Sequence, residues 1–134
     1  MSRQSQRQRG SGAGPVAVKR VYDAPDPDDG ARLLVDGLWP RGLRKEQVAV
    51  DEWLRDVAPS ADLRKWYGHR PDRFDEFVRR YRTELRDPAR AAALRRLREY
   101  RQAGPVTLLT STRDLPHAHT AVLREVLESG SDDL

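Results

Sequence analysis

The chain has 134 residues, of which 37% are hydrophobic and 34% charged. It contains no cysteine, which excludes disulfides, thiolate zinc sites and cysteine nucleophiles. It also lacks an apolar run of the ~20 residues that a membrane-spanning helix needs, and a signal-peptide-like start, so we expect a soluble cytoplasmic protein that does not bind membranes.

The net charge of +4 belongs mainly to the first residues of the chain. Residues 1–14 hold Arg3, Arg7 and Arg9 and no acid, and removing those three from the 25 basic residues leaves 22 against 21 acidic ones. The remainder therefore carries only +1, which gives little support for nucleic-acid binding. We expect a disordered basic tail over residues 1–14, one domain over residues 15–129 and a flexible acidic end over residues 130–134.

Three apolar, β-branched segments predict strands: Val16–Tyr22, Leu33–Asp36 and Val106–Thr110. Dense turn chemistry at Ala24–Gly30 separates the first two. Because about seven residues are too few for a crossover helix, these strands are either an antiparallel pair or joined by an irregular crossover.

Helical periodicity fills most of the rest of the chain. Lys45–Val57 reads as partly helical, and Ser60 is placed to cap a short helix that stops near Gly68. Longer helices are predicted from Pro71 to Leu85, from Asp87 to about Ala103 and from about Pro116 to Glu128. The fold class is therefore α/β: one compact domain with a small mixed or parallel sheet flanked by helices.

The stretch between the last strand and the last helix holds the first candidate site. Arg113, Asp114 and His117 could bind a phosphate or carboxylate and move a proton, since ligands gather where strand ends meet helix starts. Alternatively, Asp114 caps the helix and Arg113 pairs with it at the surface. On a helical wheel His119 faces inward with the apolar residues, whereas His117 points away.

A second constellation follows the second predicted strand. Asp36 ends that strand, and Arg41 follows Trp39 and Pro40 in a rigid turn. If the strands are parallel neighbours, these side chains could face the Arg113 loop. The alternative is that Trp39 fills a core edge while Asp36 and Arg41 pair.

The helical stretch Arg73–Arg101 carries ten arginines and five acids. Such a run could contact a phosphate backbone, although it more often forms a solvated face with i,i+4 ion pairs. No motif for a nucleotide, a metal or a hydrolytic nucleophile occurs, so neither a cofactor nor a metal is expected.

Several blocks in order carry a resemblance to a known family: Val18–Asp23, Asp28–Gly30, Leu34–Asp36, Leu38–Gly42, Leu63–Trp66 and Pro105–Leu109. The chain resembles the YeaO-like family of small bacterial proteins, a domain of unknown function (DUF488), from Val16 to about Glu128. The resemblance implies a compact α/β domain without an established activity or cofactor. The family typically ends in Arg-Asp-x-x-His-Asn, which Arg113, Asp114 and His117 match, but Ala118 stands where Asn is usual.

Two hypotheses of function follow. In the first, Asp36 and His117 are candidate catalytic residues, and Trp39, Arg41, Arg113 and Asp114 bind a small phosphate- or carboxylate-bearing ligand. In the second, the protein is a non-catalytic module that binds nucleic acid or protein through its arginine-rich helices. Convergence of the first set of residues on one pocket would favour the first hypothesis.

Overall fold

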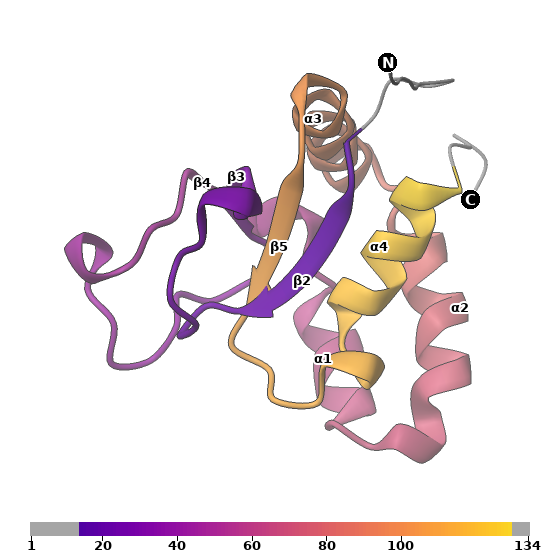
Figure 1. Cartoon of the computed structure of the whole chain (residues 1–134). Coiled ribbons are helices and arrows are strands. Elements are labelled where there is room, and N and C mark those ends of the chain that lie inside the picture. Colours follow the sequence, from indigo (N-terminus) through magenta and orange to yellow (C-terminus); the bar gives the residue numbers. More distant parts are fainter. Residues whose placement is uncertain (1–13, 130–134) are drawn as a thin grey trace.

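The computed structural model describes residues 14–129 (Figure 1). Its sheet has four parallel strands in the spatial order β2-β5-β3-β4. They are β2 (Val16–Arg20), β3 (Ala31–Leu34), β4 (Glu52–Trp53) and β5 (Val106–Thr110). The predicted α/β class is confirmed, and the described strands form a parallel sheet.

The first two strands are parallel and are not neighbours. Both pair with β5, which lies between them, and Val106 of β5 is in register with Val16 and with Ala31. The antiparallel alternative is therefore wrong, and the connection is an irregular crossover through a 3-10 turn, η1 (Pro27–Asp29).

Three ionic side chains fix that crossover to the sheet. Asp29 accepts hydrogen bonds from Lys19 Nζ (2.8 Å) and Arg32 Nη1 (2.5 Å). The Lys19 hydrogen bond is the largest of the effects that lower the pKa of Asp29 to about 2. Thr107 of β5 adds a hydrogen bond to the backbone carbonyl of Asp29 (2.8 Å).

The four α-helices of the described region pack on one face of the sheet (Figure 1). Side chains from all of them share one core cluster with Leu33, Val35 and Leu108 of the sheet region. The helices are α1 (Ala61–Tyr67), α2 (Phe74–Glu84), α3 (Pro88–Ala103) and α4 (His119–Glu128). Residues of alternate parity, such as Leu34 and Leu109, face the opposite side of the sheet, where Trp39, Val48 and Trp53 cover them.

The helix predictions hold for α1 and α3, whereas α2 begins at Phe74, after a 3-10 turn, η4 (Pro71–Arg73), and not at Pro71 as predicted. Ser60 caps α1, since its Oγ accepts a hydrogen bond from Leu63 N (3.1 Å), and Gly68 ends the helix with φ of +57°. The last helix begins later than predicted. Pro116 lies in a separate 3-10 turn, η5 (Leu115–His117), and extended backbone at Ala118 delays α4 until His119.

The prediction of a partial helix over residues 45–57 is wrong. That segment holds two 3-10 turns, η2 (Lys45–Gln47) and η3 (Arg55–Val57), with the short edge strand β4 between them. The apolar side chains that suggested a helical stripe instead cover the second face of the sheet, as Val48, Val50 and Trp53 do. Tertiary packing has overridden the local periodicity.

The predicted tail over residues 1–14 and the end over residues 130–134 fall largely outside the described residues. Gly14 is described, and it is held by two hydrogen bonds. Its N–H donates to Arg101 O (2.9 Å), and its carbonyl accepts from Arg101 Nε (3.0 Å).

Candidate functional site

One cleft is lined by all six residues that the sequence named as candidates for catalysis or ligand binding. It has a volume of about 790 Å³ and lies at the carboxyl ends of the strands, between α1 and the segment that leads from β5 to α4. These ends point towards the lower part of Figure 1, where α1 and the start of α4 lie. The six predicted side chains in its lining are Asp36, Trp39, Arg41, Arg113, Asp114 and His117.

Asp36 fixes the loop that follows β5. Its Oδ1 accepts a hydrogen bond from Thr110 Oγ1 (2.6 Å), and its Oδ2 accepts from Ser111 N (2.8 Å) and Ser111 Oγ (2.9 Å). The side chain is nearly buried and does not pair with Arg41, contrary to the alternative weighed from the sequence. Asp36 therefore couples the end of β3 to the loop that carries Arg113.

Asp114 and His117 form an ion-pair geometry within that loop. His117 Nδ1 lies 2.9 Å from Asp114 Oδ2, and the His117 ring meets Phe74 edge-on with centroids 5.3 Å apart. Tyr67 donates its hydroxyl to the His117 carbonyl (2.6 Å), and burial, reinforced by the Asp114 charge, raises the pKa of Tyr67. The alternative in which Asp114 caps the last helix is wrong, because its side chain makes no cap hydrogen bond and Ala118 occupies the cap position of α4.

His119 is the more buried of the two histidines, as its helical-wheel position indicated. Its side chain is 11% exposed, against 41% for His117. Its Nε2 lies 3.0 Å from Val35 O and 3.4 Å from Asp36 Oδ1. Burial lowers the pKa of His119, and the nearby Asp36 charge offsets part of this effect. The neutral ring can therefore donate from Nε2 to the Val35 carbonyl.

Arg64 is a site residue that the sequence reasoning missed. It lies on α1 and lines the cleft together with Lys65. A Cβ added to Gly37 would lie 2.3 Å from Arg64 Nη1, so the absence of a side chain at Gly37 leaves room for the guanidinium. The Leu63–Trp66 block already contained this arginine, but only the tertiary fold brings α1 to the end of β3.

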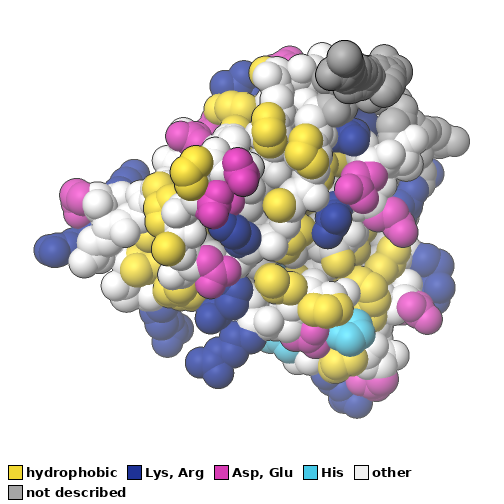
Figure 2. Space-filling model, in the orientation of Figure 1, with side chains coloured by type: hydrophobic (Ala, Val, Ile, Leu, Met, Phe, Trp, Pro, Cys, Tyr) yellow, Lys and Arg dark blue, Asp and Glu magenta, His cyan; other side chains and the backbone are white. Residues whose placement is uncertain are grey.

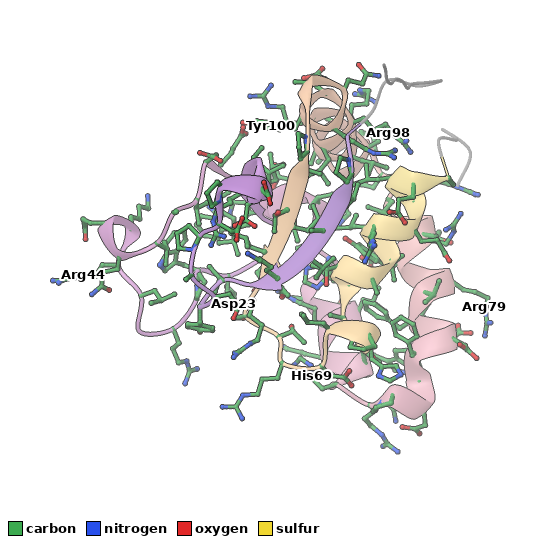
Figure 3. The ribbon with its side chains drawn as sticks, in the orientation of Figure 1. Asp23, Arg44, His69, Arg79, Arg98 and Tyr100 are labelled. Atoms are coloured by element: carbon green, nitrogen blue, oxygen red, sulfur yellow. The ribbon has the colours of Figure 1, made fainter. Side chains whose placement is uncertain are left out.

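The basic side chains of the cleft find no acidic partner in the described part of the chain. Within residues 14–129, no hydrogen bond, ion pair or ring contact is made by the side chains of Arg41, Arg64, Lys65 and Arg113. The two carboxylates in the lining, Asp36 and Asp114, are engaged as described above. Basic side chains also gather along the lower edge of the face seen in Figure 2, and Figure 3 shows His69 at this end of the molecule.

Beside these cations the cleft has an apolar wall, formed by Leu38 and Trp39. Trp39 donates its indole N–H to Leu43 O (2.6 Å) and meets Trp53 edge-on with centroids 5.4 Å apart. These contacts fix the turn that places Leu38 at the cleft, where it is 71% exposed. Trp39 thus fills the edge of the second core cluster, as the alternative from the sequence expected, and also lines the cleft.

The arginines of the helical stretch are arranged differently from those of the cleft. Most bind partners inside the protein: Glu76 pairs with Arg79 and Arg80, and Glu52 pairs with Arg96. Among the described residues, the side chains of only two of the ten, Arg86 and Arg95, lack any such contact. These helices therefore present no continuous stripe of unpaired arginines within the described part of the chain.

Residues 14–129 contain no group of three or more His, Asp or Glu side chains that could hold a metal ion. They also contain no helix with the length and apolar character that crossing a bilayer requires.

Comparisons with known proteins agree with the resemblance in the sequence. "Uncharacterized protein Rv3073c" of Mycobacterium tuberculosis H37Rv is 51% identical over 112 residues, which cover 84% of this chain and 92% of that protein. "Uncharacterized protein YeaO" of Escherichia coli K12 is 37% identical over 114 residues, which cover 85% and 97%. No solved structure matches the chain. A family model described as "Inactive DUF488-N3 subclade" matches residues 15–133. The chain therefore belongs to the YeaO-like DUF488 family, in the subclade that this description names.

Proposed function

We propose that this protein binds a small anionic ligand in the cleft and does so without catalysing a reaction on it. The observation that carries the proposal is the set of four basic side chains, Arg41, Arg64, Lys65 and Arg113, that line one cleft without an acidic partner among residues 14–129. Arginine guanidinium groups bind phosphate and carboxylate through charge-assisted, often bidentate hydrogen bonds. A cleft at the carboxyl ends of parallel strands is also where α/β proteins commonly hold ligands.

Binding without catalysis is supported by the surroundings of the two residues considered as catalytic candidates. The Asp36 carboxylate already accepts three hydrogen bonds from Thr110 and Ser111. These bonds give it a structural role, which is to hold the loop after β5. His117 Nδ1 lies against Asp114, and this pair can orient the loop that carries Arg113. The description of the matching family as inactive agrees with this view.

The alternative, nucleic-acid or protein binding through the arginine-rich helices, has less support. Those arginines mostly pair with acids or carbonyl groups of the same domain, and such pairs leave few charges for a phosphate backbone. The cleft is the better-supported site because its cations are available to a ligand.

Titration calorimetry of the full chain with inorganic phosphate at low salt tests the proposal. We expect weak, saturable binding, with the affinity lowered about tenfold in Arg64→Ala and in Arg113→Ala, since losing one charge-assisted hydrogen bond costs ~1.4 kcal/mol or more. Arg86→Ala and Arg95→Ala are the matched controls, because each removes an exposed arginine that has no partner in the described region and that lies outside the cleft.

Equal losses in all four variants would indicate a general effect of net charge and would contradict a specific site. Absence of saturable binding in the wild type would contradict the proposal directly. Gly37→Ala gives an independent check. Its added methyl group would displace the Arg64 guanidinium and should weaken binding without removing any charge.

A further inference from the structure

We propose that the natural ligand is an organic phosphate monoester whose other part is a flat apolar group. This inference rests on the anion-binding function proposed above and specifies its ligand. The first reason is size. A cleft of about 790 Å³ lies within the range of sites that enclose whole organic molecules, and it far exceeds what a single inorganic anion fills.

The charges of the cleft favour a doubly charged anion. Four cations, Arg41, Arg64, Lys65 and Arg113, face two carboxylates, Asp36 and Asp114, so the lining carries about two net positive charges when its histidines are neutral. A phosphate monoester carries about −1.5 to −2 near neutral pH, whereas a carboxylate carries −1. A phosphate monoester therefore balances the lining and a monocarboxylate does not.

The apolar wall indicates the other part of the ligand. Leu38 and Tyr22 are the two large hydrophobic side chains that are exposed among the described residues, and of these Leu38 lines the cleft. The rigid turn at Trp39 and the buried Pro40 hold Leu38 in this position. An apolar ring that covered Leu38 would remove the surface of both groups from water, which favours binding. A ligand whose non-phosphate part is polar would not gain this free energy.

The cations and the apolar wall belong to one cleft, so one molecule can reach both. Arg41 follows directly on the Leu38–Trp39–Pro40 turn, and Arg64 lies over Gly37, the residue before Leu38. The anionic group and the ring must therefore be close together in the ligand, as they are in a short aryl or heterocyclic phosphate.

Calorimetry of the full chain with four compounds tests the inference: phenyl phosphate, inorganic phosphate, glycerol phosphate and benzoate. We expect phenyl phosphate to bind about tenfold more tightly than either inorganic or glycerol phosphate, because its ring buries apolar surface against Leu38, and benzoate to bind more weakly than phenyl phosphate. Leu38→Ser should remove the advantage of phenyl phosphate and leave the affinity for inorganic phosphate unchanged. Tyr22→Ser, which changes the exposed hydrophobic residue outside the cleft, should leave all four affinities unchanged.

The outcomes separate this inference from the proposed function. Equal binding of phenyl phosphate and inorganic phosphate, or no effect of Leu38→Ser, would overturn the apolar group while the anion site stands. Benzoate binding as tightly as phenyl phosphate would overturn the phosphate monoester. If none of the four compounds binds, the proposed anion site itself fails.

Discussion

At the scale of single residues, Asp36 holds the loop that follows β5, a structural role that its position in the sequence did not indicate. One carboxylate satisfies the Thr110 hydroxyl, the Ser111 hydroxyl and the Ser111 N–H at the end of β5. Charged acceptors make stronger hydrogen bonds than neutral ones. A buried donor that loses such an acceptor destabilises the folded protein, because it has given up its hydrogen bonds to water without replacement.

We therefore expect Asp36→Ala to lower the free energy of unfolding by about 2–3 kcal/mol, because it leaves these donors without an acceptor. Urea denaturation measures the loss. Asp56→Ala, at an exposed aspartate of η3 without a hydrogen bond or ion pair in the described region, is the control and should cost less than about 0.5 kcal/mol. Similar losses in both variants would show that Asp36 does not hold the loop.

His119 gives the protein a pH-dependent stability. Burial lowers its pKa in the folded protein below the ordinary value of 6.5; Asp36 opposes this shift, while Arg64 and His69 add to it. Below pH 6.5 the unfolded chain therefore binds more protons at this residue than the folded chain does. The contribution of His119 is fully present above that pH and is lost as the pH falls towards the folded pKa.

The expected result is a wild-type stability that declines from pH 7 to pH 5, with a smaller slope in His119→Gln, whose amide can still donate to the Val35 carbonyl. A single histidine contributes at most about 1.4 kcal/mol per pH unit to this slope. Unfolding curves at several pH values measure it. His69→Gln is the comparison, and it should change the slope less than His119→Gln, because His69 is exposed and is the smallest of the effects that shift the pKa of His119. Unchanged slopes in His119→Gln would contradict this role.

At the scale of elements, the crossover between β2 and β3 depends on a close approach to the start of β5. Gly30 has φ of +64°, and a Cβ there would lie 2.1 Å from Pro105 O. The Ala31 N–H then donates to that same carbonyl (3.0 Å), which begins the pairing of β3 with β5. A short irregular connection can replace a crossover helix because the backbone itself contacts the sheet here.

Gly30→Ala should lower the free energy of unfolding by about 3 kcal/mol or prevent folding, since backbone strain adds to a backbone clash. Gly42→Ala is a matched control. Gly42 also has a positive φ, +79°, but a Cβ there would meet no atom within 4 Å. Gly42→Ala should therefore lower the free energy of unfolding by only about 1–2 kcal/mol, because alanine disfavours a positive φ. Thermal melts of the two variants compare these effects, and equal losses would show that the contact with Pro105 is unimportant.

At the scale of the whole molecule, charge is distributed in two ways. The helices carry many arginines that mostly pair within the fold, while the cleft concentrates cations that have no acidic partner among residues 14–129. The net charge of +4 therefore describes neither surface well.

We expect only weak, sequence-independent binding to DNA and RNA at ~150 mM salt, and its loss on adding salt, because a few unpaired charges release few counterions. Mobility-shift titrations with duplex DNA and single-stranded RNA check this. Tight binding with a sequence preference, weakened by Arg86→Ala and Arg95→Ala, would instead support the helical surface as a nucleic-acid interface.

The sequence by itself determined the α/β class, three of the four strands among residues 14–129, the long helices and the family. These follow from local signals: β-branched runs, helical spacing, the Ser60 cap and the Gly68 stop. It also named six residues that line the cleft.

Only the tertiary structure decided the parallel order of the strands, the edge strand β4 and the contribution of Arg64. Strand order depends on which distant segments pair, and β4 is too short to produce a period of its own. Arg64 joins the site because α1 packs beside the end of β3, a contact that no local pattern in the chain records.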